Sequence, residues 1–405
     1  MTTRPSRRTV LGVAGAAVAS GAALAVTGAA GAATGTAGAR PGRIPDDLKP
    51  GGALDRLVAD MAARDEFSGS LLLTYRGEPV LARSHGMANK ALSVQNGPDT
   101  IFGLASVTKM LTAVAIGQLA QRRAIGYGDP LGRYVDGFPA AIADTVTIHH
   151  LLTHSSGLGD FHAMPGYWDT ARTWTTAEQV VAGITDFVRR STLAFAPGAG
   201  HLYSNSGFHL LGEIVAKASG QSFFEYMREH VFGPAGMSGS DFYTTAQRRD
   251  DRRIARPYQK QASGERVDTL DQHVFVGTGP GGAFATCAGM DSFARALLAD
   301  ELLDPPFTRL TLGGKIPLSD QQSPDDVTGE QNGPAQIGFK AYAGSASLSD
   351  KNEWSHGLSG GSTHGASTNL VLYPDSGWVS VILSNYEGRT VQPIADLARR
   401  LIVGA

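Results

Sequence analysis

A serine and a lysine stand three residues apart in the otherwise apolar segment 104–111, LASVTKML. If a helix begins at Ser106, Lys109 lies one turn later on the same face, and Ser106 meets the free N–H groups and the positive dipole of the helix start. A hydroxyl beside an amine pairs a nucleophile with a proton acceptor, provided that burial or other cations disfavour the charged amine. One S-x-x-K match is expected by chance in a chain of this length, and the alternative is a serine N-cap followed by a surface lysine.

A second pair of polar residues, Tyr203 and Asn205, supports the catalytic interpretation of Ser106 and Lys109. Tyr203 and Asn205 enclose Ser204 in a loop between two expected helices, and no other tyrosine of the chain has an asparagine two positions later. A tyrosine near Lys109 could take the proton of Ser106 as general base, while the Asn205 amide could bind a substrate amide. The alternative is a turn in which the asparagine bonds its own backbone.

Two rival sites are weaker. The run 357–361, GLSGG, matches the G-x-S-x-G nucleophile elbow, with Ser359 as nucleophile, but a strand-like segment follows and no histidine occurs after His364. His150 and His154 have the i, i+4 spacing of zinc ligands, but the glutamate of H-E-x-x-H is absent. We therefore expect neither an elbow nor a metal site.

The elements that must position these residues alternate along the chain. Alternating apolar residues predict strands over 70–75, 79–84, 370–373 and 378–383, with turns between the members of each pair. Helical spacing predicts a helix from about 107 towards Gly126, a helix with a capping box from Thr175 or Thr176, two helices that follow Tyr203, and a final helix over about 393–403. Residues 304–349 predict loops or short strands. The fold class is therefore α/β (α+β), with an antiparallel sheet built from both chain ends, flanked by helices, and an inserted helical region.

Composition excludes several function classes. The chain has 405 residues, is 42% hydrophobic and carries a formal charge of -2, which argues against nucleic acid as a partner. Its single cysteine, Cys287, excludes a disulfide framework. Residues 1–39 join Arg7 and Arg8 to an Ala-rich apolar run that ends in AGA, as in a twin-arginine export signal. We expect an extracellular or cell-envelope protein without a stable membrane anchor.

Taken together, the motifs resemble the serine β-lactamase and penicillin-binding protein superfamily, in its branch of class C β-lactamases, D,D-carboxypeptidases and related esterases. The carriers are S-x-x-K at 106–109, Y-x-N at 203–205, the segment HHLLTHSSGLGD at 149–160 and the closing hairpin around 369–388. The resemblance implies a β-lactamase/transpeptidase-like fold, with the sheet domain in 40–105 and 287–405 and the helical domain in 106–286. It also implies Ser106 as acylated nucleophile, Lys109 as its proton partner, Tyr203 as general base and Asn205 as substrate contact, without cofactor or metal.

The third motif of this branch departs from the pattern. The branch has His or Lys, any residue, then Gly, whereas residues 353–368 read EWSHGLSGGSTHGAST. Counting forward favours His356 with a local insertion, and counting back from Gly365 favours Ser359 or Leu358. We expect His356, Ser359 and Gly360 to contact substrate, and the missing lysine favours esters or amides without a strictly required carboxylate.

The expected function is that of an exported serine hydrolase acting on a small molecule or peptide, including cell-wall peptide, in the manner of a D,D-carboxypeptidase or esterase. A true β-lactamase is the alternative within this chemistry. An inactive cell-wall binding module is the alternative from another class. The oligomeric state is not predicted.

Overall fold

The structure, a computed structural model, describes residues 44–318, 337–362 and 364–403. The predicted export signal lies outside these residues. Within them, no helix has the length and the apolar character needed to cross a membrane.

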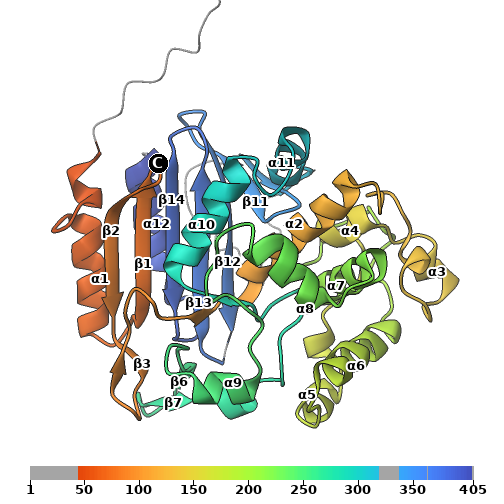
Figure 1. Cartoon of the computed structure of the whole chain (residues 1–405), viewed down its shortest axis with the longest axis horizontal. Helices are drawn as coiled ribbons and strands as arrows, with labels where there is room; N and C mark the ends of the chain where they lie inside the picture. The colour runs from red at the N-terminus through yellow and green to blue at the C-terminus, as the bar shows by residue number, and fades with distance from the viewer. Residues whose placement is uncertain (1–43, 319–336, 363, 404–405) are drawn as a thin grey trace, which may run out of the picture. The chain divides into compact units, whose positions relative to one another are not determined.

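One antiparallel sheet of eight strands draws on both ends of the described chain (Figure 1). In spatial order β1 lies between β2 and β14, so a strand near residue 70 pairs directly with one near residue 380. The full order is β2 (Glu78–His85), β1 (Gly69–Tyr75), β14 (Trp378–Ser384), β13 (Ala366–Tyr373), β12 (Trp354–Ser362), β11 (Ser345–Leu348), β10 (Ile337–Lys340) and β9 (Ile316–Pro317).

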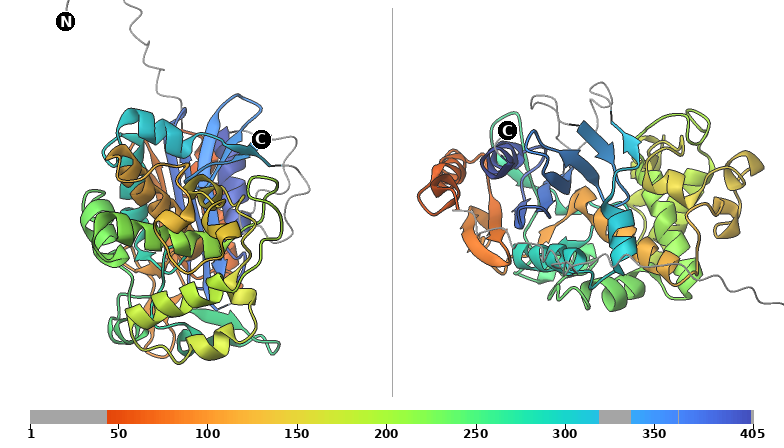
Figure 2. Two further views of the ribbon diagram at one scale, coloured as in Figure 1. Left: turned by 90° about the vertical axis from the view of Figure 1, so that its right-hand side faces the viewer. Right: turned by 90° about the horizontal axis from the view of Figure 1, so that it is seen from above.

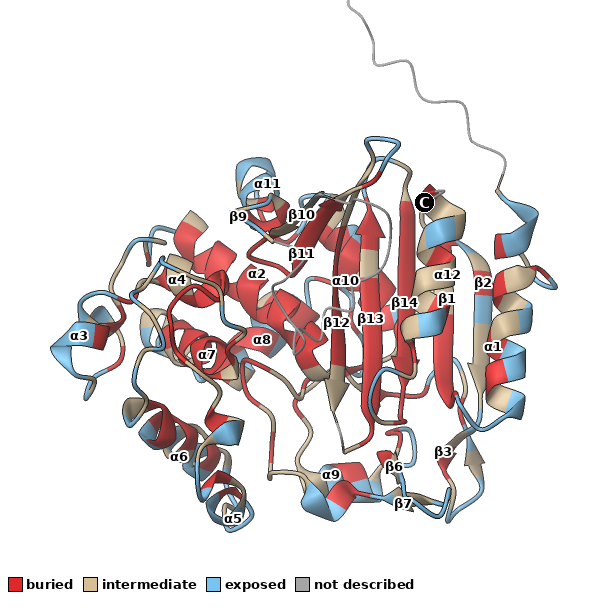
Figure 3. Ribbon diagram, turned by 180° about the vertical axis from the view of Figure 1, so that it is seen from behind, coloured by how far each residue is buried: buried red, intermediate tan, exposed pale blue. Residues whose placement is uncertain are grey.

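The two faces of this sheet are covered by different helices. Ile382 packs with α1 (Ala53–Ala63) and α12 (Gln392–Val403), while its neighbours Val381 and Leu383 belong to the larger core on the other face. That alternation follows from the two-residue period of a strand. Helix α10 (Cys287–Leu298) lies on the face opposite α12, as Figures 1 and 3 show.

The helices between the two halves of the sheet include the fully packed helix α2 (Thr108–Gln121). Every residue from Thr108 to Ala120 is buried, so α2 is a central helix with no solvent face (Figure 3). The helices α7 (Asn205–Ser219), α8 (Phe223–Met227) and α11 (Pro305–Leu312) pack against α2. The other helices of this region, which Figure 2 shows from two further sides, are α3 (Ala140–Ala143), α4 (Ile148–Leu152), α5 (Tyr167–Ala171), α6 (Ala177–Arg189) and α9 (Thr245–Asp250).

The observed mixed α/β architecture confirms the predicted fold class, and β1, β2, β13, β14 and α12 all occur where strands and a final helix were predicted. The cap of α6 is Thr176, whose hydroxyl accepts the N–H of Gln179, so Thr176 rather than Thr175 begins that helix. The prediction of loops or short strands over 304–349 was wrong for α11, which starts with two prolines in its first turn. The boundaries of the two predicted domains remain a prediction.

Candidate active site

Ser106 lies in the short 3-10 turn Ala105–Val107 that leads into α2. Ala105 has a φ of 45°, a left-handed conformation that is unfavourable for a residue with a Cβ atom. The turn is held at Leu104, whose N–H donates to the carbonyl of Ala283 and whose carbonyl accepts the Thr368 hydroxyl at 2.9 Å. The strained turn therefore has fixed supports, and it presents a nearly buried hydroxyl, 9% exposed.

The structure brings the predicted catalytic groups together. The oxygen atoms of Ser106 and Tyr203 are 2.5 Å apart, and Lys109 Nζ donates to Ser106 Oγ at 3.3 Å. Tyr203 comes from the segment just before α7, and Lys109 from the first turn of α2. The contact between α2 and α7 thus joins two motifs that are almost a hundred residues apart in the sequence.

Lys109 is 1% exposed and surrounded by oxygen atoms. Besides Ser106, its Nζ donates to Asn205 Oδ1 and to the carbonyl of Pro280, both at 2.7 Å. Three acceptors match the three N–H groups of an ammonium. The ammonium also lies 4.7 Å from the centre of the Tyr203 ring, where a positive charge favours negative charge on the phenol oxygen.

Asn205 is oriented by a residue that the motif analysis did not single out. Its Nδ2 donates to Asp160 Oδ2 at 2.6 Å, so the amide oxygen faces Lys109. Burial raises the pKa of Asp160, but the hydrogen bonds from His162 and Asn205 outweigh burial, and the pKa ends below its ordinary value. Asp160 therefore stays a carboxylate and fixes the orientation of Asn205. Its only sequence signal was its place at the end of the segment HHLLTHSSGLGD.

Gly360 of β12 lies directly against Ser106. A Cβ atom at this position would come within 2.7 Å of the Ser106 nitrogen and 3.0 Å of the Leu104 carbonyl oxygen. Only glycine allows the strand to approach so closely. Gly360, with Gly361 after it in the cavity wall, is therefore the part of the third motif that the structure brings to Ser106.

His356 and Ser359 do not lie at Ser106, which corrects the prediction that His356 fills the third motif and that both residues contact substrate. His356 is buried, stacks on Trp354 and is paired across the sheet with Leu372, and burial lowers its pKa to about 4. Ser359 accepts a hydrogen bond from Asn369 Nδ2 and, as the neighbour of Gly360 in a strand, points to the opposite face. The backward count fits better, with Leu358 two residues before Gly360 on the same face.

Neither rival site has the required geometry. Ser359 lies within β12, which is followed by β13 and not by the helix that an elbow needs. His154 Nδ1 accepts the N–H of Ser204 and its ring lies 4.7 Å from that of Tyr203. His150 takes part in the cap of α4. In the described part of the chain no group of three histidine, cysteine or acidic side chains is placed to hold a metal ion.

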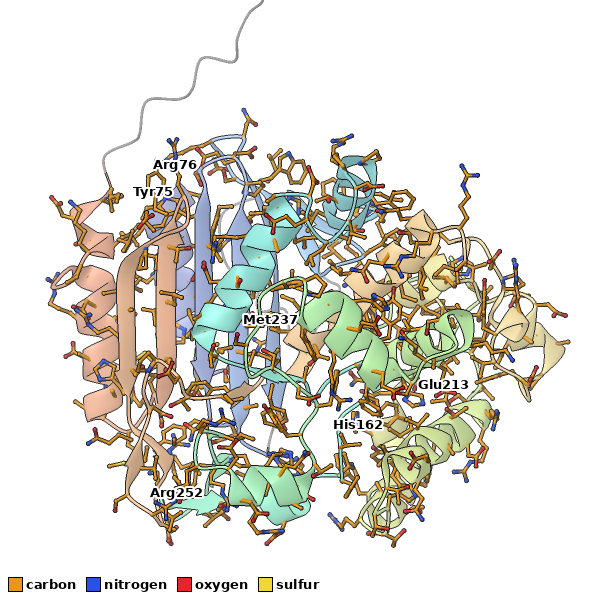
Figure 4. All side chains as sticks on the ribbon, viewed as in Figure 1. Tyr75, Arg76, His162, Glu213, Met237 and Arg252 are labelled. Atoms are coloured by element: carbon orange, nitrogen blue, oxygen red, sulfur yellow. The ribbon has the colours of Figure 1, made fainter. Side chains whose placement is uncertain are left out.

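A cavity of about 330 Å³ opens onto Ser106. One wall comes from Asn205 and from aromatic residues of the segment before and within α5, including Phe161, His162 and Trp168. His162 is labelled in Figure 4, on the side of α5 and α6. The lining also includes His364 and Gly365, between β12 and β13, and Arg248 of α9. No sequence motif pointed to Arg248.

Residues 54–405 match the sequence profile of the family described as Beta-lactamase. Two curated relatives are penicillin-binding protein 4* of Bacillus subtilis (strain 168), 31% identical over 53% of this chain and 43% of its own length, and esterase EstB of Burkholderia gladioli, 33% identical over 50% of this chain and 53% of its own length. The chain thus spans about half the length of these relatives.

Solved structures resemble nearly the whole described chain. A penicillin-binding protein from Bacillus halodurans has a TM-score of 0.71 and 26% identity, over 84% of this chain and 98% of its own. A D-amino acid amidase from Ochrobactrum anthropi SV3 has a TM-score of 0.68 and 21% identity, over 87% of this chain and 100% of its own, and shows the shared fold.

Proposed function

Since this chain belongs to the Beta-lactamase family, we propose that it is a serine hydrolase that cleaves an ester or amide bond through an acyl-enzyme on Ser106. The observation that carries the proposal is the 2.5 Å contact between the oxygen atoms of Ser106 and Tyr203, with Lys109 bonded to the same serine. A nucleophile within hydrogen-bond distance of a base, and a base supported by a third group, is the general arrangement of covalent acyl transfer.

The proposed reaction uses only groups of this chain. Tyr203 takes the Ser106 proton as the serine oxygen attacks the carbonyl carbon, and the bond to the leaving group breaks as Tyr203 returns that proton to it. The N–H groups of Ser106 and Gly361 are the donors for the oxyanion, each worth roughly 2.7–4 kcal/mol in other serine hydrolases. Water then attacks the acyl carbonyl carbon as Tyr203 takes its proton, and the bond to the Ser106 oxygen breaks as Tyr203 returns that proton to the serine.

The substrate class that we propose is that of D,D-carboxypeptidases and esterases. Relatives named as an esterase and as putative D-alanyl-D-alanine carboxypeptidases support this choice. The side chain two residues before Gly360 is the apolar Leu358, so the cation that would favour a penicillin carboxylate at that place is missing. β-Lactamase activity is the second candidate, favoured by the family profile.

Export also belongs to this proposal. Its support is the pair Arg7 and Arg8 before the apolar run of residues 9–39. The direct test compares the full chain with its Arg7→Lys, Arg8→Lys variant. We expect the first to be exported and the second to be retained.

The deciding experiment follows the intact mass of the protein over time after addition of a penicillin, and in parallel the turnover of a short-chain chromogenic ester. We expect Ser106→Ala to abolish both the adduct and turnover, and Ser359→Ala to keep both. A stable adduct indicates peptidase-like chemistry, and an adduct that clears as the drug is consumed indicates a β-lactamase. Labelled Ser106→Ala would refute the nucleophile, and cell-wall binding without any turnover would favour the inactive module.

A further inference from the structure

Arg248 is a buried cation in the wall of the cavity that holds Ser106. It is 6% exposed and the only buried residue of α9, whose capping box at Thr244 and Gln247 turns this position inward. Its guanidinium lies 4.8 Å from the centre of the Phe284 ring. Because Phe284 pairs with Gly103, three residues before Ser106, this aromatic support is part of the same structure that carries the nucleophile.

No carboxylate or carbonyl of the described residues accepts a hydrogen bond from this guanidinium, and its Nε is buried without a partner. Asp268 attracts Arg248 through space, but the cation bonded to Asp268 is Arg256, at 3.5 Å. Burial lowers the pKa of Arg248 to about 9. A buried cation without a hydrogen-bonded partner is costly, so such groups are normally paired. An anion bound in the cavity would supply the partner that Arg248 lacks within the described residues.

The cavity is chemically suited to an anion at this end. Arg248 is the only lysine or arginine among the described residues that line it, and none of those residues is an aspartate or glutamate. The adjacent His273 is neutral, because burial and Arg248 lower its pKa to about 3. Among the residues that line the cavity, an anionic group beside Arg248 would therefore meet one positive charge and no negative charge, and the carboxylate of Asp268, outside the lining, is already paired with Arg256.

The mechanism indicates which part of a substrate reaches Arg248. The leaving group must receive a proton from Tyr203 and hence lies beside Tyr203, which is not among the cavity walls. The acyl group, bonded to Ser106, is then the part that occupies the cavity. Since Ser106 and Arg248 line the same space, the far end of the acyl group is what the guanidinium contacts.

We propose that Arg248 binds a carboxylate at the far end of the substrate's acyl group, so that the preferred substrates are monoesters or monoamides of a dicarboxylic acid or an equivalent acidic peptide. This rests on the proposed function, and it adds to that function the anionic character of the acyl group. A planar guanidinium can hold both oxygens of a carboxylate, which a lysine cannot.

The test compares 4-nitrophenyl monoesters of adipate, pimelate and suberate with the same esters in which the free carboxylate is a carboxamide. The series varies the distance from the ester to the charge, and each pair differs in that charge alone. We expect kcat/KM of the full-length protein to favour the carboxylate by about 10- to 100-fold for at least one length, as for a charge-assisted hydrogen bond. Arg248→Gln should remove that preference while keeping turnover of the carboxamides, and Arg248→Lys should restore part of it.

Arg252→Gln is the matched control. Arg252, labelled in Figure 4, is exposed two residues after the end of α9, so the same change in net charge occurs near the site but outside the cavity. We expect it to keep the preference. If Arg248→Gln lowered kcat/KM equally for the carboxylate and the carboxamide esters, Arg248 would have a structural role and the proposal would be overturned. Carboxamides hydrolysed by the wild type as fast as carboxylates at every length would also overturn it, even if Arg248→Gln did not fold, and would leave the serine hydrolase intact. Absence of turnover and of Ser106 labelling with any reagent would instead refute the proposed function.

Discussion

At the scale of single residues, the proposed proton transfer depends on the Tyr203 hydroxyl. Tyr203→Phe keeps the ring between Lys109 and His154 and removes only the oxygen that contacts Ser106. We expect kcat/KM for a chromogenic ester to fall by about 10²–10⁴-fold, the usual contribution of a positioned base, without a change in melting temperature. Tyr134→Phe, which removes a hydroxyl bonded to Asp129 and changes no residue of the cavity wall, is the control. Activity retained within a few-fold would make Lys109 the base.

Gly360 gives a second prediction at this scale, because its missing side chain is what allows β12 to approach Ser106. In Gly360→Ala the new Cβ atom would clash with the Ser106 nitrogen, at 2.7 Å, and with the Thr368 hydroxyl, also at 2.7 Å. We expect a loss of about 1–3 kcal/mol in the free energy of unfolding, and acylation at least tenfold slower, measured by melting and by the rate of Ser106 labelling.

Gly338→Ala in β10 is the matched control for Gly360→Ala, because the nearest atom to its new Cβ lies 3.9 Å away. If Gly360→Ala acylated at the wild-type rate, the close approach of β12 would have no part in positioning Ser106.

At the scale of elements, the site depends on how the sheet holds the turn before α2. The Thr368 hydroxyl of β13 donates to the carbonyl of Leu104, and both atoms are buried. Thr368→Val removes one of the two donors to that carbonyl in nearly the same volume and leaves it only the N–H of Val107. We expect about 0.5–1.5 kcal/mol of destabilisation, the net worth of one hydrogen bond, together with slower acylation because the strained turn at Ala105 loses a support.

Thr368→Ser keeps the hydroxyl and removes the methyl group, so it is the control for a change in packing alone. Slower acylation in both variants to the same degree would assign the effect to packing, and unchanged acylation in Thr368→Val would show that the turn is held by its other contacts. Burst-phase labelling separates acylation from later steps in all three proteins.

At the scale of the whole molecule, buried histidines make stability depend on pH. Burial lowers the pKa of His209 and His273 to about 3 and that of His356 to about 4, against an ordinary value of 6.5. Below pH 6.5 these histidines take up protons in the unfolded chain but stay neutral in the folded protein. The free energy of unfolding that they contribute above pH 6.5 is therefore lost as the pH falls towards these values. Each fully neutral histidine contributes at most about 1.4 kcal/mol per pH unit.

His209→Gln tests this dependence. His209 bonds Thr185 of α6 and Thr278 beside the active-site cavity, and a glutamine offers similar hydrogen-bonding groups without a titrating ring. We expect the melting temperature of the wild type to fall between about pH 7 and pH 5, and that of the variant to fall less over the same interval. Equal slopes in the two proteins would exclude His209 as a source of the acid sensitivity.

The sequence by itself determined the fold class, and it predicted the residues that the structure brings together around Ser106. Ser106, Lys109, Tyr203 and Asn205 lie in short motifs whose spacing is local, and the strands at both ends and the helices between them follow from hydrophobic periods that are also local. Only the tertiary structure decided the third motif, the role of Asp160 and the place of Arg248. These three features depend on the register of β12 against the turn at Ser106 and on contacts between segments far apart in the chain. The two-residue period of a strand predicts which residues share a face, but not which of them will lie beside a given atom.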